Sequence, residues 1–251
     1  MPETCSFERT HEMDGQNPTL IEGLPGMGLV ASIAADQVRR NLDLAQIGHL
    51  RSGGFPPMAS FEDGLVEETM RVYGGTEPAV LTLHSSAPVP EEAVGSLADC
   101  VLKDLAHEFQ QAIFLVGAPA QSEDQLGQVR GIGTNPGQRE RLTEAGIDLA
   151  EHTGTIGGVT GALLQACYRA QVPAVALVTR CRPKIPDPGA ARSVIENGLE
   201  PLVDFDLDTS DLEERDEEIQ RRLDEVARQY QQSQTTTPAG AAEEAPASLY
   251  H

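Results

Sequence analysis

Short apolar runs alternate with longer amphipathic segments from residue 19 to about residue 200. The short runs predict β-strands at 19–22, 47–51, 65–73, 79–84, 112–116, 127–133 and 172–179. The amphipathic segments predict helices at 29–41, 91–110, 136–145, 157–170 and 187–197, with Gly198 as the stop of the last one. This alternation indicates an α/β fold, a three-layer sandwich with a mostly parallel central sheet.

Two parts of the pattern indicate how the strands are placed. The run 172–179 is continuously apolar, which is typical of a parallel strand that is covered on both faces. The runs 65–73 and 79–84 flank a glycine- and proline-containing turn and predict a hairpin. No linker or internal repeat interrupts residues 18–208, so we expect one α/β domain over that range.

The two ends of the chain follow a different pattern. Residues 1–17 are polar and are expected to be flexible. Residues 209–231 predict a strongly charged amphipathic helix with apolar positions at Leu212, Ile219, Leu223, Val226 and Tyr230. Asp216 occupies the position that would complete this stripe. The stripe packs either on its own domain or along a seam between subunits, and the pattern does not choose between the two.

Residues 232–251 predict a disordered tail, rich in Gln, Ser, Thr, Pro, Ala, Gly and Glu, that ends in Leu249-Tyr250-His251. Such an ending has the form hydrophobic–Tyr–any. The terminal carboxylate can pair with a lysine in a partner's pocket, while the Tyr250 ring and Leu249 supply apolar contact. His251 is expected to contribute mainly its main-chain carboxylate. We therefore expect these three residues to bind a partner.

Composition narrows the possible partners. The 251 residues contain 18 Lys and Arg against 39 Asp and Glu, a formal net charge of −21, which argues against binding nucleic acid or an anionic membrane surface. Only Lys103 and Lys184 are lysines and there is no Trp, which is typical of a surface adapted to high salt. There is no signal-peptide pattern and no apolar stretch of about 20 residues, so a cytoplasmic protein is expected.

Two glycine-rich loops are the candidates for a cofactor site. Residues 26–31 have the form G-x-G-x-x-A, with Gly26 and Gly28 in the positions that approach a pyrophosphate in dinucleotide-binding turns. No acidic residue follows at the expected distance, so a tight turn that needs small residues is favoured. The loop with Gly157, Gly158 and Gly161 opens a helix but lacks the lysine of a P-loop, and close packing is favoured there too. No cofactor is predicted.

The candidates for chemistry at the strand ends are sparse. His84 and Ser85 end a predicted strand, but no G-x-S-x-G motif accompanies them. The cysteines form no C-x-x-C pair and have no histidine at ligand spacing, so neither a metal site nor a disulfide is expected; they are Cys5, Cys100, Cys167 and Cys181. The chain is accordingly predicted not to be an enzyme.

Taken together, three segments resemble the proteasome assembly chaperone family, specifically its second type and the archaeal homologues. These are residues 21–28 (Ile-Glu-Gly-Leu-Pro-Gly-Met-Gly), residues 154–161 and residues 186–191 (Pro-Asp-Pro-Gly-Ala-Ala), followed by the acidic helix. The resemblance implies a fold like that of nucleoside phosphorylases without their catalytic residues, a homo-oligomeric assembly and, with the charge, a haloarchaeal source.

Some archaeal members of that family end in hydrophobic–Tyr–any, dock on the α-ring of the 20S proteasome, and assist its assembly or open its gate without ATP. The resemblance maps Leu249, Tyr250 and His251 onto this docking motif and names 20S α-subunits as the partner. Two alternatives stay open: a nucleoside- or nucleotide-processing enzyme with its site near Gly26, Gly28 and the His84-Ser85 strand end, and an oligomeric scaffold unrelated to proteasomes.

Overall fold

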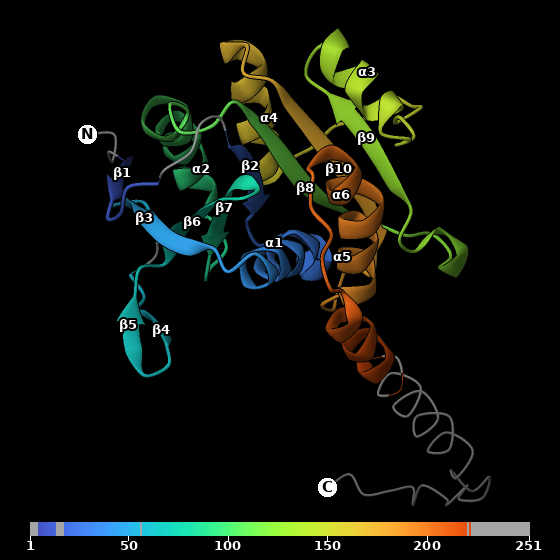
Figure 1. Ribbon diagram of the computed structural model, residues 1–251, viewed down its shortest axis with the longest axis horizontal. Coiled ribbons are helices and arrows are strands. Elements are labelled where there is room, and N and C mark those ends of the chain that lie inside the picture. The colour runs from blue at the N-terminus through green and yellow to red at the C-terminus, as the bar shows by residue number, and fades with distance from the viewer. Residues whose placement is uncertain (1–4, 14–17, 56, 220, 222–251) are drawn as a thin grey trace, which may run out of the picture.

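An eight-stranded sheet runs through the computed structural model, which describes residues 5–13, 18–55, 57–219 and 221 (Figure 1). Its strand order is β1–β3–β6–β7–β2–β8–β10–β9. The strands are β1 Cys5–Arg9, β2 Thr19–Gly23, β3 Ala45–Ser52, β6 Met70–Thr76, β7 Ala79–Ser85, β8 Gln111–Pro119, β9 Val129–Gly133 and β10 Ala174–Cys181. A separate two-stranded hairpin is formed by β4 Ser60–Glu62 and β5 Leu65–Glu67.

Helices connect and cover these strands. The α-helices are α1 Val30–Asn41, α2 Glu91–Cys100, α3 Pro136–Glu144, α4 Gly158–Ala170, α5 Pro188–Val194 and the short α6 Glu200–Leu202. A π-helical turn extends α2 over Val101–Leu105, and another joins α5 to α6 over Ile195–Leu199. Residues 210–219 are also helical.

The sheet is mixed, so the expectation of a mostly parallel sheet was wrong. Only the neighbouring pairs β7–β2, β2–β8 and β8–β10 at the centre of the sheet are parallel. The pairs β1–β3, β3–β6, β6–β7 and β9–β10 are antiparallel. The reason lies in the connections: β6 and β7 are joined by a tight turn, which forces antiparallel pairing, whereas parallel neighbours need a longer crossover.

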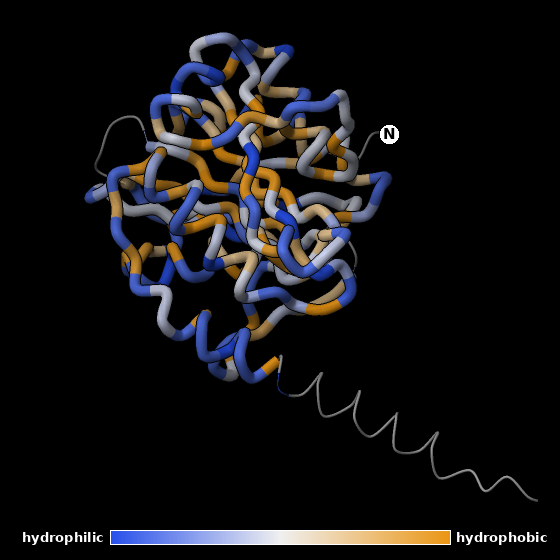
Figure 2. Tube along the Cα trace, turned by 90° about the vertical axis from the view of Figure 1, so that its right-hand side faces the viewer, coloured by the Kyte–Doolittle hydropathy of each residue, from blue (hydrophilic) through white to orange (hydrophobic). Residues whose placement is uncertain are grey.

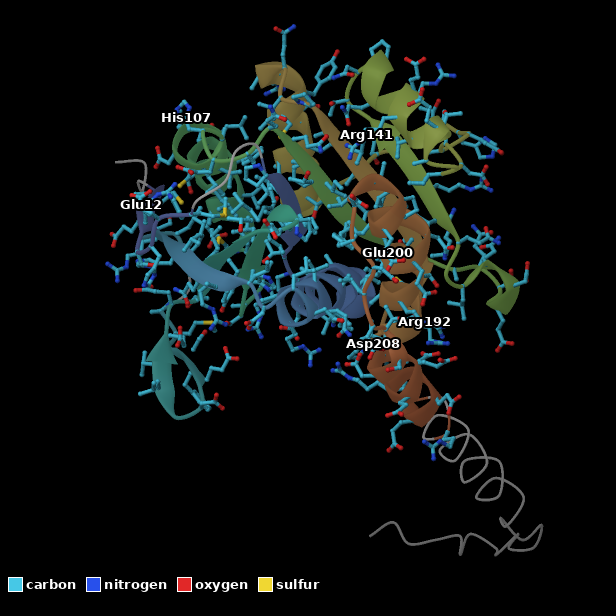
Figure 3. All side chains as sticks on the ribbon, in the orientation of Figure 1. Glu12, His107, Arg141, Arg192, Glu200 and Asp208 are labelled. Carbon is cyan, nitrogen blue, oxygen red and sulfur yellow. The ribbon has the colours of Figure 1, made fainter. Side chains whose placement is uncertain are left out.

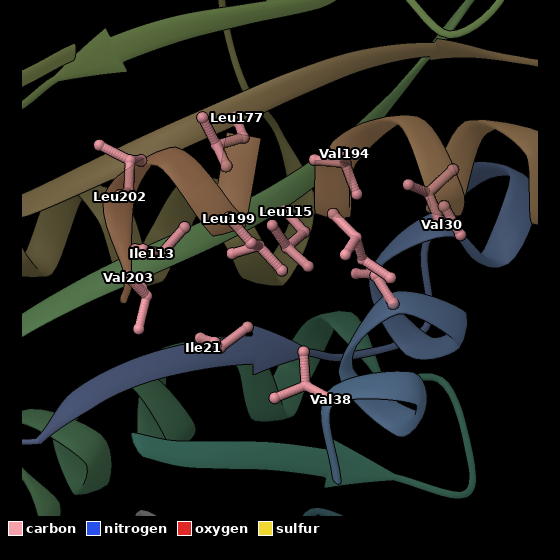
Figure 4. Close-up of a cluster of buried hydrophobic side chains, with 14 of the residues drawn as sticks. Ile21, Val30, Val38, Ile113, Leu115, Leu177, Val194, Leu199, Leu202 and Val203 are labelled. Atoms are coloured by element: carbon pink, nitrogen blue, oxygen red, sulfur yellow. The ribbon is translucent and has the colours of Figure 1, made fainter. Parts of the chain in front are cut away.

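Two buried clusters lie on opposite faces of the sheet and make three layers. Ile113 and Leu115 of β8 point to the face that is covered by α1, α3 and α5 (Figure 4). Their neighbours Ala112 and Phe114 point to the face that is covered by α2 and α4. This alternation along a strand that is buried on both sides explains the continuous apolar runs of the central strands. The tube coloured by hydropathy shows these runs in the middle of the molecule (Figure 2).

The N-terminal segment is not wholly flexible, because residues 5–9 form the edge strand β1. It pairs antiparallel with β3, and Phe7 lies opposite Leu50. A Cβ atom at Gly48 of β3 would lie 2.5 Å from the Phe7 ring, so this close approach depends on glycine. The polar composition of residues 1–17 hid a strand that presents only one side to the core.

Three helix and strand boundaries also differ from expectation. Gly198 does not end its helix; it lies inside the π-helical turn, where a Cβ atom would come within 2.8 Å of Leu177 of β10. Glycine is needed there for packing, not for termination. The predicted helix 91–110 stops earlier, after the π-helical turn. The predicted strand 65–73 divides into β5 and β6, while its hairpin with β7 is confirmed.

The described part of the C-terminal helix packs on its own domain. Leu212 is fully buried in the cluster formed with α1 and α5. The Gln37 amide donates to the Asp211 carboxylate and to the Asp208 carbonyl, both at 2.6 Å, and Arg192 pairs with Glu213 at 2.9 Å. Arg192 and Asp208 lie beside this helix (Figure 3). Leu223, Val226, Tyr230 and the whole tail 232–251 lie outside the described residues.

Candidate functional site

The carboxyl ends of the four parallel strands meet at one edge of the sheet, and the first glycine loop packs tightly there. Gly28 adopts φ +64°, and a Cβ atom on it would lie 2.9 Å from the Cys181 sulfur at the end of β10. A Cβ atom at Gly117 of β8 would lie 2.2 Å from the Met27 carbonyl oxygen. Packing therefore requires Gly28. Gly26 has no such neighbour, and the loop is pressed onto the sheet where a dinucleotide would need access.

The second glycine loop is explained in the same way. Gly158 adopts φ +66° at the start of α4. A Cβ atom at Gly161 would lie 2.1 Å from the Ile156 carbonyl oxygen, so the loop can fold back on the helix only with glycine at this position. Gly157 has open space around it. Gly161 thus serves local packing, and Gly158 serves the left-handed backbone conformation at the start of the helix.

Glu22 joins the two glycine loops from a fully buried position at the end of β2. Its Oε1 accepts a hydrogen bond from the Leu24 amide at 3.0 Å, and the Thr160 hydroxyl of α4 lies 3.4 Å from both carboxyl oxygens. Burial raises the pKa of Glu22 to about 8, partly offset by these hydrogen bonds. A carboxyl group that is neutral at mid-range pH therefore links β2 to α4.

Arg182 joins three segments that are far apart in sequence. Its Nη1 lies 3.0 Å from the Asp187 carboxylate and 2.9 Å from that of Asp216 on helix 210–219. Asp187 is 1% exposed; it also accepts from the Arg182 amide at 2.7 Å and, as the N-cap of α5, from the Ala190 amide at 3.0 Å. Its own amide donates to the Gly28 carbonyl at 2.8 Å. We call Arg182, Asp187 and Asp216 the clamp.

The clamp explains the interruption in the apolar stripe of the C-terminal helix. Asp216 takes the place of an apolar residue because it faces Arg182 and the backbone of Gly189, where a Cβ atom would lie 2.9 Å from its carboxylate. The motif 186–191 therefore fastens the C-terminal helix to the carboxyl edge of the sheet. Sequence reasoning identified the motif but not this role; the acid inside an apolar stripe was the available signal.

A cleft of about 280 Å³ opens at the carboxyl end of β7, beside the start of α1. It is lined by apolar, hydroxyl and charged side chains, namely Leu29, Ser32, Ile33, Asp36, Arg71, His84, Ser85, Ser86 and Arg215. The chain leaves β2 through α1 on one face of the sheet and leaves β7 through α2 on the other. The cleft therefore lies at a topological switch point, the usual place for a ligand in an open α/β sheet.

The geometry of the cleft does not pair a nucleophile with a base. A ring nitrogen of His84 is hydrogen-bonded to the Thr82 hydroxyl at 2.9 Å, and the Ser85 hydroxyl donates to the Ala87 carbonyl at 2.6 Å. Burial lowers the pKa of His84 to about 4. His84 also packs edge-on against Tyr73 at 5.1 Å. The two residues singled out in the sequence are adjacent but do not act on each other.

The two cysteines nearest the glycine loops and α4, Cys181 and Cys167, are buried and unreactive. Burial raises the pKa of the Cys181 thiol to about 11 and that of Cys167 to about 12, so both are protonated at neutral pH. Over the ranges that the structure describes, no group of three or more His, Cys, Asp or Glu residues could hold a metal ion, and no helix is long and apolar enough to span a membrane.

A known protein family matches most of the chain. Residues 20–227 match the sequence model of the PAC2 family. The chain belongs to the PAC2 family. An uncharacterized protein of Methanocaldococcus jannaschii is 25% identical over 235 residues, which cover 92% of this chain and 94% of that protein.

Solved structures agree with this assignment. The chain is similar to Pyrococcus furiosus PbaA, an archaeal homolog of proteasome-assembly chaperone, at 25% identity and a TM-score of 0.79, covering 92% of this chain and 95% of PbaA. PbaB of the same organism, an archaeal proteasome activator, shares the fold at 21% identity and a TM-score of 0.79, over 90% of this chain and 100% of PbaB.

The residues predicted to bind a partner are not tested by the structure. Leu249, Tyr250 and His251 are outside the described residues and outside the span 20–227 that matches the family.

The two acids of the clamp should differ sharply in their contribution to stability. Asp187→Ala removes a buried acceptor of three hydrogen bonds and should lower the free energy of unfolding by about 3 kcal/mol. Asp216→Ala removes a partly exposed ion pair and should lower it by about 1 kcal/mol or less. Chemical denaturation measures both. Equal losses would contradict a clamp that is centred on Asp187.

Glu22 should make the protein less stable as the pH rises. Its pKa of about 8 in the folded protein exceeds the ordinary 4.5, so between those values the unfolded chain has released a proton that the folded chain keeps. The free energy of unfolding should therefore fall by about 1.4 kcal/mol per pH unit from this group, and level off above pH 8. Glu22→Gln should remove this slope, while Glu140→Gln, at an exposed position, should keep it. An unchanged slope in Glu22→Gln would refute the assignment.

Proposed function

We propose that this protein is an ATP-independent assembly chaperone or activator of the 20S proteasome, which docks its C-terminal tails on the α-ring. The observation that carries the proposal is membership of the PAC2 family together with similarity to PbaA, a homolog of proteasome-assembly chaperone, over 92% of the chain. The ending Leu249-Tyr250-His251 adds a docking sequence of suitable chemistry.

The tail docks by inserting its last residues into a pocket between α-subunits. The terminal carboxylate pairs with a lysine there, Leu249 fills an apolar recess, and the Tyr250 ring adds a large contact area at low entropic cost. A homo-oligomer carries several such tails, and a tether of the composition predicted to be disordered gives the second and later tails a high effective concentration. Affinity for a ring of repeated pockets then exceeds the affinity of one tail.

The body supplies a fixed starting point for each tail. The clamp and Leu212 hold helix 210–219 against α1 and α5, so the chain leaves the domain at a defined place. The excess of acid with only two lysines suits a high-salt, haloarchaeal cytoplasm, where charge repulsion between copies is screened. The proposed role is to bind the proteasome. The domain, with a fold like that of nucleoside phosphorylases, serves as the scaffold for the tails.

A nucleoside- or nucleotide-processing enzyme is the second candidate, favoured by the cleft at the switch point with Arg71 and Arg215 in its lining. Against it, His84 and Ser85 are bonded to other groups. Thermal melting with nucleosides, phosphate or dinucleotides separates the two. Our proposal predicts no shift, whereas an enzyme would gain about 2.7 kcal/mol at a ligand concentration 100-fold above its dissociation constant, and Arg215→Gln would reduce that gain.

Removal of the last three residues should abolish binding to 20S particles. Deletion of Leu249-Tyr250-His251 should prevent co-sedimentation at native salt, and Tyr250→Ala should weaken it by about 2 kcal/mol or more, a change of about 30-fold. His251→Ala is the matched control, because it keeps the terminal carboxylate and should bind as the wild type does. Undiminished binding by the truncated chain would overturn docking through the tail.

A further inference from the structure

The hairpin of β4 and β5 carries the most exposed apolar side chains that the structure describes. Phe61 is 79% exposed, Val66 78%, Leu65 69% and the adjacent Met58 53%. The hairpin projects from the sheet at the same end of the molecule as helix 210–219 (Figure 1). Four large apolar side chains in one protruding segment exceed what a free surface normally carries. We call residues 58–67 the arm.

The two faces of the arm differ in chemistry. Phe61 lies opposite Val66 in the register, so their side chains share one face. The other face carries Glu62 and Glu67, which bind Arg71 of β6 at 3.1 and 3.6 Å. An isolated two-stranded hairpin is marginally stable by itself, so these ion pairs hold it to the body. The Phe61–Val66 face points away from those contacts.

The cleft beside the arm has both apolar and charged side chains in its lining. Arg71 is common to both, since it binds the arm and lines the cleft. Arg71 Nε and Ser32 Oγ are buried without a hydrogen-bond partner in the described structure. Leu29 and Ile33 give the cleft an apolar wall, and no described residue forms an ion pair with Arg215. The cleft thus combines this apolar wall with Arg215, with Arg71 that already binds the arm of its own protomer, and with one acid, Asp36.

We propose that a second copy of this chain covers the arm, with the arm of each protomer seated in the cleft of the other about a two-fold axis. This rests on the self-association that is part of the proposed function. Arm and cleft lie next to each other, so a two-fold axis can satisfy both contacts at once. The cleft of about 280 Å³ has room for the Phe61 ring, since a cavity of roughly 150 Å³ admits benzene. Asp63 at the arm tip then meets Arg215.

A partner of the same chain also implies a particular salt dependence. Each copy carries a net charge of −21, so two copies repel each other at low ionic strength. Apolar contact at Phe61 and Val66 is not weakened by salt. Association should therefore strengthen as KCl is raised, which is opposite to the behaviour of a contact made only by ion pairs.

Sedimentation velocity of the full chain over a concentration series tests the arm. The wild type should self-associate, and Phe61→Ser with Val66→Ser should raise the dissociation constant roughly 100-fold or more, since each buried apolar side chain of this size contributes roughly tenfold. Tyr168→Ser is the matched control: Tyr168 is 61% exposed on α4, away from the arm, and its loss should change nothing. Because Phe61, Val66 and Tyr168 are exposed, the variants should fold like the wild type, which thermal melting would verify.

A charge exchange tests the cleft as the acceptor. Arg215→Glu should weaken association about tenfold, and adding Asp63→Arg should restore it. Absence of recovery would overturn the cleft as the seat of the arm. An arm variant that self-associates like the wild type would overturn the proposal while leaving the proteasome role intact. A wild type that stays monomeric at every concentration would overturn both the arm contact and the proposed oligomer.

Discussion

The arrangement of the C-terminal half depends on the two ion pairs of Arg182. One guanidinium at the end of β10 binds the buried Asp187 at 3.0 Å and Asp216 of helix 210–219 at 2.9 Å. Asp187 in turn caps α5 and donates its amide to the Gly28 carbonyl. The first glycine loop, the helix after β10 and the C-terminal helix are therefore held at one point, and a charged network in that position requires all partners to be present.

The glycine loops and the segment 186–191 consequently have architectural roles. Gly28 and Gly161 permit close backbone approach, Glu22 joins β2 to α4 through Thr160, and Asp187 anchors α5. No cofactor role is needed to account for them. Among the described residues, the apolar arm and the cleft beside it are the features that architecture does not explain. A rigid body with peripheral contact elements suits a protein that acts by binding other proteins.

The sequence predicted the central strands, most helices and the β6–β7 hairpin because buried runs and turns leave a local pattern. It missed what depends on pairing between distant segments. The antiparallel pairs β1–β3 and β3–β6 join strands whose partners no local pattern names, and β1, β4 and β5 are short strands of mixed composition. The cleft brings Arg215 beside His84, 131 positions earlier, which no local pattern encodes. Glu22 and Asp216 were visible as acids in apolar settings, but their partners were not.

The proposed function depends on C-terminal tails that enter pockets of the 20S α-ring. An electron cryomicroscopy map of the full chain bound to 20S particles tests this docking. Docking through the tail predicts density for Leu249-Tyr250-His251 inside pockets between neighbouring α-subunits, with the domain above the ring. A complex in which those pockets are empty while the domain contacts the ring elsewhere would contradict it.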